Sequence, residues 1–586
     1  MGSIVGFSLY QAIEAADITR AKSAQQRALS YYKHLENKTI DIGRTRLEVW
    51  GHPELTECVH WTADGDLLVR VGSPHNPVSW RVVQEGLLNA REPEDYELPW
   101  EGRVVLLRIS ADGERWMMWN DWIGSIPVYH AQIGGGRIAS TLEPVVVAGG
   151  GYTPDDFYLP GLVSLLVNGH FISDWTLYKD MKVVPPDSVA EWDGDGFCAK
   201  RLWTVKPSQE RWESSWDDLV DEMYALSYKA IADVLKTQPR WILPLSSGLD
   251  SRLIAAVGAD IGANMHAYTW GSKETTDVVY SRQIAKTLGI PWKHIKLPSD
   301  FLVRYTPQWA DLFGSAMHFH GMYQMSFLDE LDLEPIGCII SGFLGDTVAT
   351  DSLALFAPNQ GRIYRDWSPH WHLQETQELF IINIDEAISH ITSTLVAQLS
   401  AFPGAEYQKF GLLEIWSRQS FMNYFQLVLH DYKRGVAAPY LDRTYARFCM
   451  SLPRAVMADR LLQKAVYRRY HGRLAVIPGS YASEPIILTG RYLICRRIAR
   501  VLPSKFHYGP FKGFRDAQLR MDTDSIRASG RAALWPIDEV REALAAWIDL
   551  SHIDLAYEAV LSDRDDIRPL RKLQSIQTFA YRLKSN

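Results

Sequence analysis

The chain has 586 residues, of which 47% are hydrophobic and 22% charged, and its net charge is −8. This length and composition predict a globular protein of two or more domains, and the negative charge argues against nucleic-acid binding. No apolar run reaches the ~18 residues that a membrane-spanning helix needs. The five cysteines are far apart and form no metal-binding pattern, and their odd number fits a reducing compartment better than a disulfide framework. Without a recognisable signal peptide, we expect a cytoplasmic protein.

The first part of the chain, to about residue 200, has the pattern of β-strands. Short apolar or alternating runs are separated by Gly, Pro, Asp and Asn, and the clearest are Leu67–Val71, Val104–Ile109 and Trp116–Trp119. Gly134–Gly136 predicts the turn of a hairpin. Residues 204–218 are polar without a clear period. We place a domain boundary there, which gives domains of residues 1–205 and 215–586.

The second part of the chain alternates strand-like and helical runs from residue 241 to about 350. The expected strands are Ile242–Leu245, Met265–Trp270, His294–Leu297 and Ile336–Ile340, and the helices between them are Ser251–Gly258 and Asp277–Leu288. This alternation predicts a parallel sheet that binds its ligand beyond the carboxyl ends of the strands. From about residue 370 the pattern is helical, with expected helices at Gln374–Ser400, Lys409–Tyr432, Arg443–Ser451, Leu461–Tyr470 and within Pro536–Lys584.

Two polar loops directly follow expected strands of that sheet. The stretch Trp241–Arg252, WILPLSSGLDSR, combines a buried strand, a loop of small residues and a helix start. Backbone N–H groups of such a loop, together with the positive end of the helix dipole, favour a phosphate. Asp250 in this loop and Asp346 in the loop Ser341–Asp346 are expected at one crevice, where carboxylates suit Mg²⁺. The simpler alternatives are a helix cap for Asp250 and an ordinary turn for Asp346.

Several motifs in the same order resemble the asparagine synthetase family. SSGLDS resembles its PP-loop S-G-G-x-D-S, with Ser247 in place of the first glycine, and SGFLGD resembles its second loop, S-G-x-G-x-D-E. Further similar segments are Ala267–Gly271, Pro439–Asp442 with Ser451–Pro453, and, in the first domain, Asp121–Tyr129 with Ala139-Ser140 and Glu143. The resemblance runs from about residue 100 to 480.

The resemblance implies an α+β N-terminal domain, a glutaminase-like sandwich of the Ntn-hydrolase type. It also implies an α/β PP-loop ATP pyrophosphatase domain with a helical C-terminal part. ATP and Mg²⁺ are the implied cofactors, with Asp250 and Asp346 as metal ligands and Asp250 as a catalytic residue. The implied nucleotide-binding residues are Ser246, Ser247, Gly248, Leu249, Asp250, Ser251, Thr269, Ser341, Gly342 and Gly345. A substrate carboxylate would form an acyl-adenylate, and an amine would displace AMP to give an amide.

The sequence departs from the family at three places. Members that use glutamine begin with a catalytic Cys, but Met1-Gly2-Ser3 stands here, so we expect no glutamine hydrolysis. Phe343 replaces an acidic residue, and Thr347 replaces the Glu after Asp346. The late lysine of the family has no clear counterpart. Lys464 is the nearest candidate for a catalytic lysine, and a solvated helix charge is the alternative.

The amine is therefore expected to be free ammonia or an amine of the substrate. If the amine belongs to the substrate itself, the enzyme would resemble β-lactam synthetase or a lasso-peptide cyclase. A lasso-peptide cyclase would have a precursor peptide and its protease as partners. Alternatives are an ammonia-dependent asparagine synthetase-like enzyme, an enzyme that amidates a surface polysaccharide, and a non-catalytic ATP-binding scaffold. Arg418, His430 and Arg434 lie at helical spacing and could line a substrate pocket, although inter-helix hydrogen bonds and surface charge explain them more simply. Neither nucleic acid nor membrane insertion is expected, and the sequence does not predict the oligomeric state.

Overall fold

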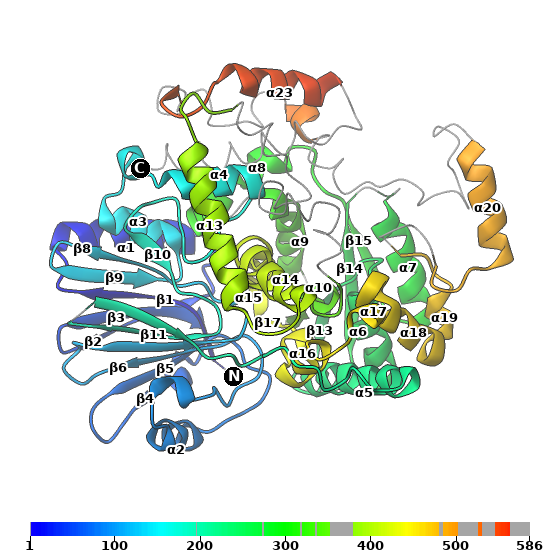
Figure 1. Cartoon of the computed structure of the whole chain (residues 1–586), viewed down its shortest axis with the longest axis horizontal. Coiled ribbons are helices and arrows are strands. Elements are labelled where there is room, and N and C mark those ends of the chain that lie inside the picture. Colours follow the sequence, from blue (N-terminus) through cyan, green and yellow to red (C-terminus); the bar gives the residue numbers. More distant parts are fainter. Residues whose placement is uncertain are drawn as a thin grey trace.

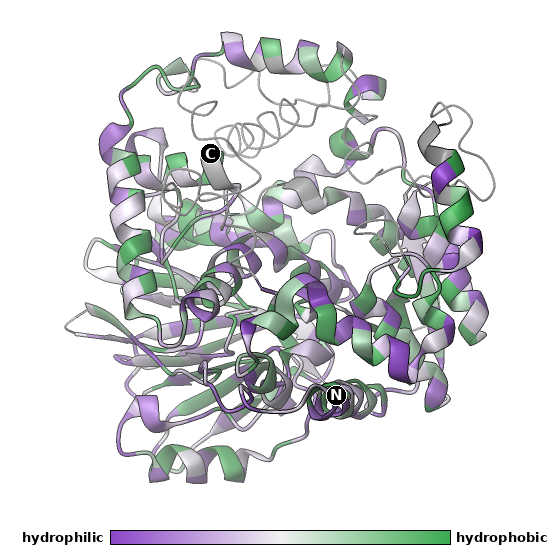
Figure 2. Cartoon of the chain, turned by 45° about the vertical axis from the view of Figure 1, so that its right-hand side comes forward, coloured by the Kyte–Doolittle hydropathy of each residue, from purple (hydrophilic) through white to green (hydrophobic). Residues whose placement is uncertain are grey.

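A computed structural model of the chain describes residues 2–562 except 195, 272, 274, 317–318, 334–336, 352–378, 480–484, 502–524 and 530–544. A strand-rich N-terminal domain lies beside a second domain of mixed helices and strands (Figure 1). Helices at the surface, such as α23 (Ser551–Ser562), alternate hydrophilic and hydrophobic residues (Figure 2). In the described part of the chain, every helix is too short or too polar to cross a membrane.

The N-terminal domain is a sandwich of two antiparallel layers. Its twelve strands are connected as one sheet, but a single bridge, between Ile4 and Val71, joins the two layers. The first layer contains β1 (Ser3–Gln11), β2 (Glu36–Ile42), β3 (Thr45–His52), β8 (Tyr129–Ile133), β9 (Gly136–Ser140) and β10 (Met181–Val183). The second contains β4 (Val59–Trp61), β5 (Leu67–Val71), β6 (Val105–Ile109), β7 (Trp116–Asn120), β11 (Ser188–Asp193) and β12 (Gly196–Arg201). Apolar side chains of both layers share one core, which stabilises their face-to-face packing.

Helices cover both outer faces of this sandwich. Helices α1 (Ala15–Leu29) and α3 (Glu143–Gly150) pack on the first layer, and α2 (Trp80–Asn89) packs on the second (Figure 1). The expected α+β sandwich is therefore confirmed, and so is the hairpin at Gly134–Gly136, which joins β8 to β9.

The second domain is built on five parallel strands in the order β15-β14-β13-β16-β17. They are β13 (Trp241–Pro244), β14 (Met265–Trp270), β15 (Trp292–Ile295), β16 (Cys338–Ile340) and β17 (Val436–Ala437). Helices α6 (Leu249–Asp260) and α7 (Thr276–Leu288) follow β13 and β14. Strands β14 and β15 are added on one side of β13, and β16 and β17 are added on the other. The loops after β13 and β16 therefore meet at the switch point where parallel sheets bind ligands.

The elements differ in detail from those expected. Strand β15 begins two residues earlier than expected and β16 two residues later. The single helix expected over Lys409–Tyr432 is three segments: α14 (Glu406–Glu414), the π-helical η7 (Ile415–Asn423) and α15 (Phe425–Arg434). Helix α13 (Asp385–Ala401) begins later than Gln374, and residues 374–378 lie outside the described residues. Most of Pro536–Lys584 also lies outside them, apart from α23 and the residues just before it.

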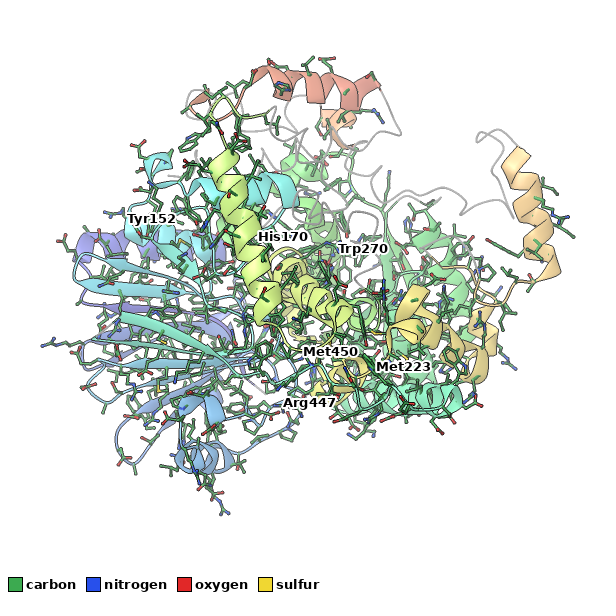
Figure 3. The ribbon with its side chains drawn as sticks, viewed as in Figure 1. Tyr152, His170, Met223, Trp270, Arg447 and Met450 are labelled. Atoms are coloured by element: carbon green, nitrogen blue, oxygen red, sulfur yellow. The ribbon has the colours of Figure 1, made fainter. Side chains whose placement is uncertain are left out.

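The two domains meet along η7 and α15. Tyr432 of α15 accepts a hydrogen bond from Trp50 Nε1 at 2.9 Å, and its carbonyl accepts one from His34 at 3.0 Å. A fully buried ion pair joins Arg103 of the N-terminal domain to Asp431. Further bonds come from α16 (Arg443–Cys449), where Arg447 donates to Glu97 at 2.7 Å, and Arg447 lies where the two domains meet (Figure 3). Because many of these partners are buried, the N-terminal domain fixes the position of α15.

Candidate functional site

A cavity of about 350 Å³ lies at the carboxyl ends of β13, β14 and β16. Its walls come from the loop after β13, the end of β14, η4 (Phe319–Gln324), the loop after β16, and the segment η7–α15. Of the residues expected to bind the nucleotide, Ser246, Asp250, Ser251, Thr269, Ser341 and Gly342 line it, as does Asp346. Ser247, Gly248, Leu249 and Gly345 do not line it but belong to the same two loops, whose shape they determine.

The loop Ser246–Ser251 is held by its own hydroxyl groups. The hydroxyls of Ser246 and Ser251 lie 3.0 Å apart, and Gly248 N–H donates to Ser246 at 3.1 Å. Asp277 accepts both the N–H of Ser247 at 2.8 Å and its hydroxyl at 2.7 Å. Helix α6 begins after Gly248 without a side-chain cap. The N–H groups of its first turn are therefore suited to an anion.

Buried side chains of α6 itself and of the C-terminal half fix this loop from behind. Arg252 is buried and donates to the carbonyl of Ser247 at 2.7 Å and to those of Leu474 and Ile477 at 3.0 and 2.9 Å. Tyr440 donates to the carbonyl of Asp250 at 3.0 Å, and Tyr467 donates to that of Leu249. The start of α6 is thus rigid, as a preorganised site requires.

The loop after β16 packs directly against the loop after β13. A Cβ atom on Gly345 would lie 2.8 Å from Asp250 Oδ1 and 2.9 Å from its Cβ, and one on Gly342 would lie 3.1 Å from Ser251 N. Only glycine permits this approach. The structure therefore brings together the two loops that the sequence placed at one crevice.

Replacing Gly345 with alanine should disturb the site strongly, because its methyl group would displace the Asp250 carboxylate. We expect a loss of about 1–3 kcal/mol in the free energy of unfolding, as for other overpacked buried sites, and a weaker affinity for Mg·ATP. Calorimetric titration and urea unfolding would measure both. Gly411→Ala in α14 is the matched control, since nothing lies within 4 Å of its added Cβ. Equal effects of the two variants would contradict the packing argument.

Asp250 is paired in this structure. Arg460 Nη2 lies 2.8 and 2.9 Å from its two oxygens, and Gln463 Nε2 donates to Oδ1 at 3.3 Å and to the carbonyl of Gly345 at 3.1 Å. Burial raises the pKa of Asp250, Arg460 opposes this shift, and the charge of Asp346 adds to it. Burial lowers the pKa of Arg460, but the negative charges of Asp250 and Asp346 have the larger combined effect and raise this pKa above its usual value.

The residue that approaches Asp250 is Arg460, not the expected Lys464. Lys464 lies on α18 (Leu461–Tyr470) and does not line the cavity; its ammonium group is 2.6 Å from the exposed carboxylate of Asp459. Asp459 and Arg460 both have a left-handed backbone, with φ of 49° and 57°. This conformation costs roughly 1–2 kcal/mol per residue, and it turns Arg460 back toward the loop. The sequence gives no signal for it.

Asp250 and Asp346 are the carboxylates suited to a metal ion. In the described residues, no group of three or more His, Cys, Asp or Glu side chains forms a metal cage. Mg²⁺ is commonly held by one or two carboxylates together with substrate phosphates and water. The donor set therefore fits Mg²⁺ that arrives with a nucleotide.

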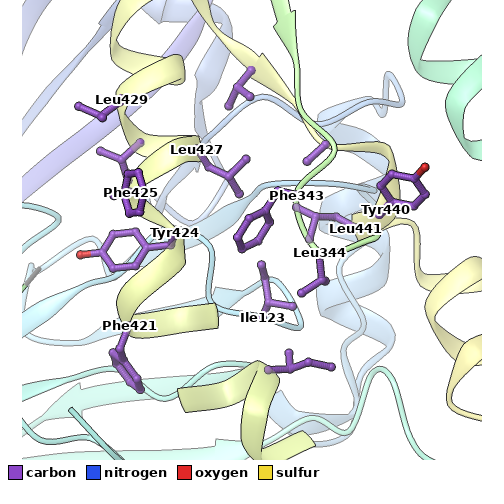
Figure 4. Packing of buried hydrophobic residues seen from close by; sticks show 14 of the residues in the cluster. Ile123, Phe343, Leu344, Phe421, Tyr424, Phe425, Leu427, Leu429, Tyr440 and Leu441 are labelled. Carbon is purple, nitrogen blue, oxygen red and sulfur yellow. The ribbon is translucent and has the colours of Figure 1, made fainter. Parts of the chain in front are cut away.

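Phe343 forms an apolar part of the cavity wall. It is buried and lies among Ile123, Leu344, Tyr424 and Leu427, of which Ile123 belongs to the N-terminal domain (Figure 4). A phenyl ring cannot transfer a proton, so proton transfer would need other side chains of the cavity. Thr269 uses its hydroxyl structurally, since it donates to the carbonyl of Leu245 at 2.6 Å.

Residues 224–378 match the family model for asparagine synthase. This stretch of the chain is similar to an asparagine synthase domain. The matched region includes both cavity loops, and with them Asp250 and Asp346. Asp277, Arg460 and Gln463 are additional residues of this site that the sequence did not single out. Asp277 had a signal, because it lies in the first turn of the helix after β14.

Two solved structures are similar to about half of the chain. One is glutamine phosphoribosylpyrophosphate amidotransferase from B. subtilis complexed with ADP and GMP, at 9% identity and a TM-score of 0.24, covering 49% of this chain and 65% of that one. The other is an allosteric regulatory enzyme of purine biosynthesis, at 9% identity and a TM-score of 0.25, covering 49% and 80%. Identities and TM-scores this low do not define the fold of this chain, which rests on its own strands and helices. None of the curated proteins matches the sequence.

Proposed function

We propose that this protein is an ATP-dependent ligase that activates a carboxylate as an acyl-adenylate and joins it to an amine without hydrolysing glutamine. The observation that supports it most is the contact between the two loops at the switch point, which puts Asp250 and Asp346 on one cavity beside the N-terminus of α6. This arrangement suits a nucleotide whose α-phosphate faces the cavity.

The residues of the loop would act on the departing pyrophosphate. The substrate carboxylate attacks the α-phosphorus, the bond to the β-phosphate oxygen breaks, and the amine later displaces AMP from the acyl carbon. First-turn N–H groups of α6 stabilise the negative charge that develops on the pyrophosphate. Mg²⁺, when bound, neutralises phosphate charge, and Arg460 and Gln463 keep the Asp250 carboxylate in place.

The packing at the start of β1 supports independence from glutamine. A Cβ atom on Gly2 would lie 2.2 Å from the carbonyl oxygen of Glu54, so no side chain fits there. Ser3 is buried and pairs within the strands β1 and β3. Neither residue exposes a nucleophile to a substrate. The amine is then free ammonia or an amine of the substrate itself.

We expect Mg²⁺-dependent exchange of pyrophosphate into ATP when a carboxylate substrate is present, and AMP release when an amine is added. Glutamine should yield no glutamate, whereas ammonium or a substrate amine should support AMP release. Radiolabelled exchange and a glutamate assay measure the two reactions. Binding of Mg·ATP without exchange across a broad panel of acids would favour a non-catalytic scaffold. Glutamate formation would contradict the proposal for the N-terminal domain.

A further inference from the structure

The wall of the cavity opposite the phosphate loop is polar but carries little net charge. It is the inner face of η7 and α15, with Arg418, Gln419, Asn423, Gln426 and His430. Arg418 lies 2.8 Å from the buried carboxylate of Glu414, which compensates its charge within the helix. Asn423 donates to Gln419 at 2.9 Å. This wall thus offers amides and an imidazole rather than a free cation.

Two side chains of the cavity have hydrogen-bonding atoms without partners. Gln324 and His430 are only 3% and 1% exposed, and both line the cavity. Among the residues that the structure describes, nothing bonds to Gln324 Oε1 or to either ring nitrogen of His430. Buried polar atoms are nearly always paired, so unpaired ones need an explanation. Here both residues contribute to the wall of the cavity.

The surroundings of His430 keep it uncharged. Its ring meets the edge of Phe327 at 5.8 Å, and Phe327 stacks on Trp270 at 4.8 Å. Burial lowers the pKa of His430 to about 3. The neutral imidazole offers one donor and one acceptor, and Gln324 adds a second acceptor. A carboxylate would face the acceptor of Gln324 and would meet no positive charge on His430.

We propose that Gln324 and His430 recognise an uncharged group of the carboxylate substrate that both donates and accepts hydrogen bonds. Hydroxyls and carboxamides have this chemistry, whereas the second carboxylate of an acidic amino acid does not. The proposal rests on the ligase function proposed above and specifies its substrate: a carboxylic acid with neighbouring hydroxyl or amide groups. The unpaired atoms then gain partners only when this substrate binds, which favours it over charged competitors.

The first test measures the thermal stability of the free protein. Gln324→Leu and His430→Phe each remove unpaired buried polar atoms, so each should raise the Tm by about 1–2 °C. The control is Gln408→Leu, because Gln408 is equally buried but fully paired, with Nε2 bonds of 2.8 and 2.7 Å and an accepted bond of 2.8 Å. That variant should lower the Tm. A fall in Tm for both Gln324→Leu and His430→Phe would show a structural role and overturn the proposal.

The second test measures pyrophosphate exchange at saturating Mg·ATP with three acids: D-glucuronate, N-acetyl-L-asparagine and L-aspartate. We expect exchange with the hydroxylated acid, the amide acid or both, and this result separates the two sources of the shared chemistry. Gln324→Leu should raise the KM for that acid ~10-fold and leave the KM for ATP unchanged, with partial recovery in Gln324→Asn. Exchange with L-aspartate alone, or with none of the acids, overturns the proposal. Loss of stabilisation by Mg·ATP in the unaltered protein would instead refute the ligase function.

Discussion

Asp250→Asn should lower pyrophosphate exchange by roughly 10²–10³-fold, the range seen when one preorganised electrostatic contact to a transition state is removed. Asp250 lines the cavity at the first turn of α6 and contacts the second loop, where the charge of Asp346 acts on it. The variant keeps the size of the side chain but loses the charge that a magnesium-bound phosphate needs. Radiolabelled exchange at several Mg²⁺ concentrations would measure the loss.

The same variant leaves Arg460 largely buried without its carboxylate, so part of the loss could come from misfolding. The double variant Asp250→Asn/Arg460→Met removes both charges and should recover stability but not exchange. Asp260→Asn, at the exposed end of α6, is the matched control and should exchange normally. Full exchange in Asp250→Asn would remove Asp250 from the mechanism.

Arg103→Met should reduce the free energy of unfolding by about 3–5 kcal/mol, because breaking a buried ion pair leaves an uncompensated charge. The side chains of Arg103 and Asp431 are 2% and 0% exposed. Asp431 follows His430 on α15, so the KM for the carboxylate substrate should also rise. Urea unfolding and exchange kinetics would measure the two effects.

Arg46→Met is the matched control for Arg103→Met. Arg46 pairs with Asp41 at 2.8 Å on the surface of the same domain, where both side chains are exposed. Water and salt screen such pairs, so we expect little change in stability. If Arg103→Met were as mild as Arg46→Met, the contact between the domains would not determine the position of α15.

Local pattern was sufficient to predict several strands and helices of both domains and the approach of the two loops. Strands such as Leu67–Val71 and Met265–Trp270 are bounded by turn residues. In the second domain, the alternation of strands with helices determines a parallel sheet. In such a sheet, polar loops at the carboxyl ends converge. This is why Asp250 and Asp346 could be placed together from sequence alone.

Other parts of the site depend on contacts that no local pattern encodes. Arg460 directly precedes α18, and Lys464 lies four residues later in the first turns of this helix. The left-handed backbone at Arg460 determines that Arg460, and not Lys464, reaches Asp250. The π-helical turn of η7 changes which side chains face the cavity, and the expected single helix did not include it. The unpaired polar atoms of Gln324 and His430 result from how the interior packs, and no local sequence pattern around these residues indicates them.

The placement of α15 between the domains makes the N-terminal sandwich part of the support of the cavity. One side of this helix faces the cavity with Gln426 and His430. Its other side takes bonds from His52 at 2.7 Å and Trp50 at 2.9 Å, both on β3 of the N-terminal sandwich. A substitution that shifts α15 on the sandwich would therefore also move the cavity wall, so the N-terminal domain acts as the outer support of its neighbour's site.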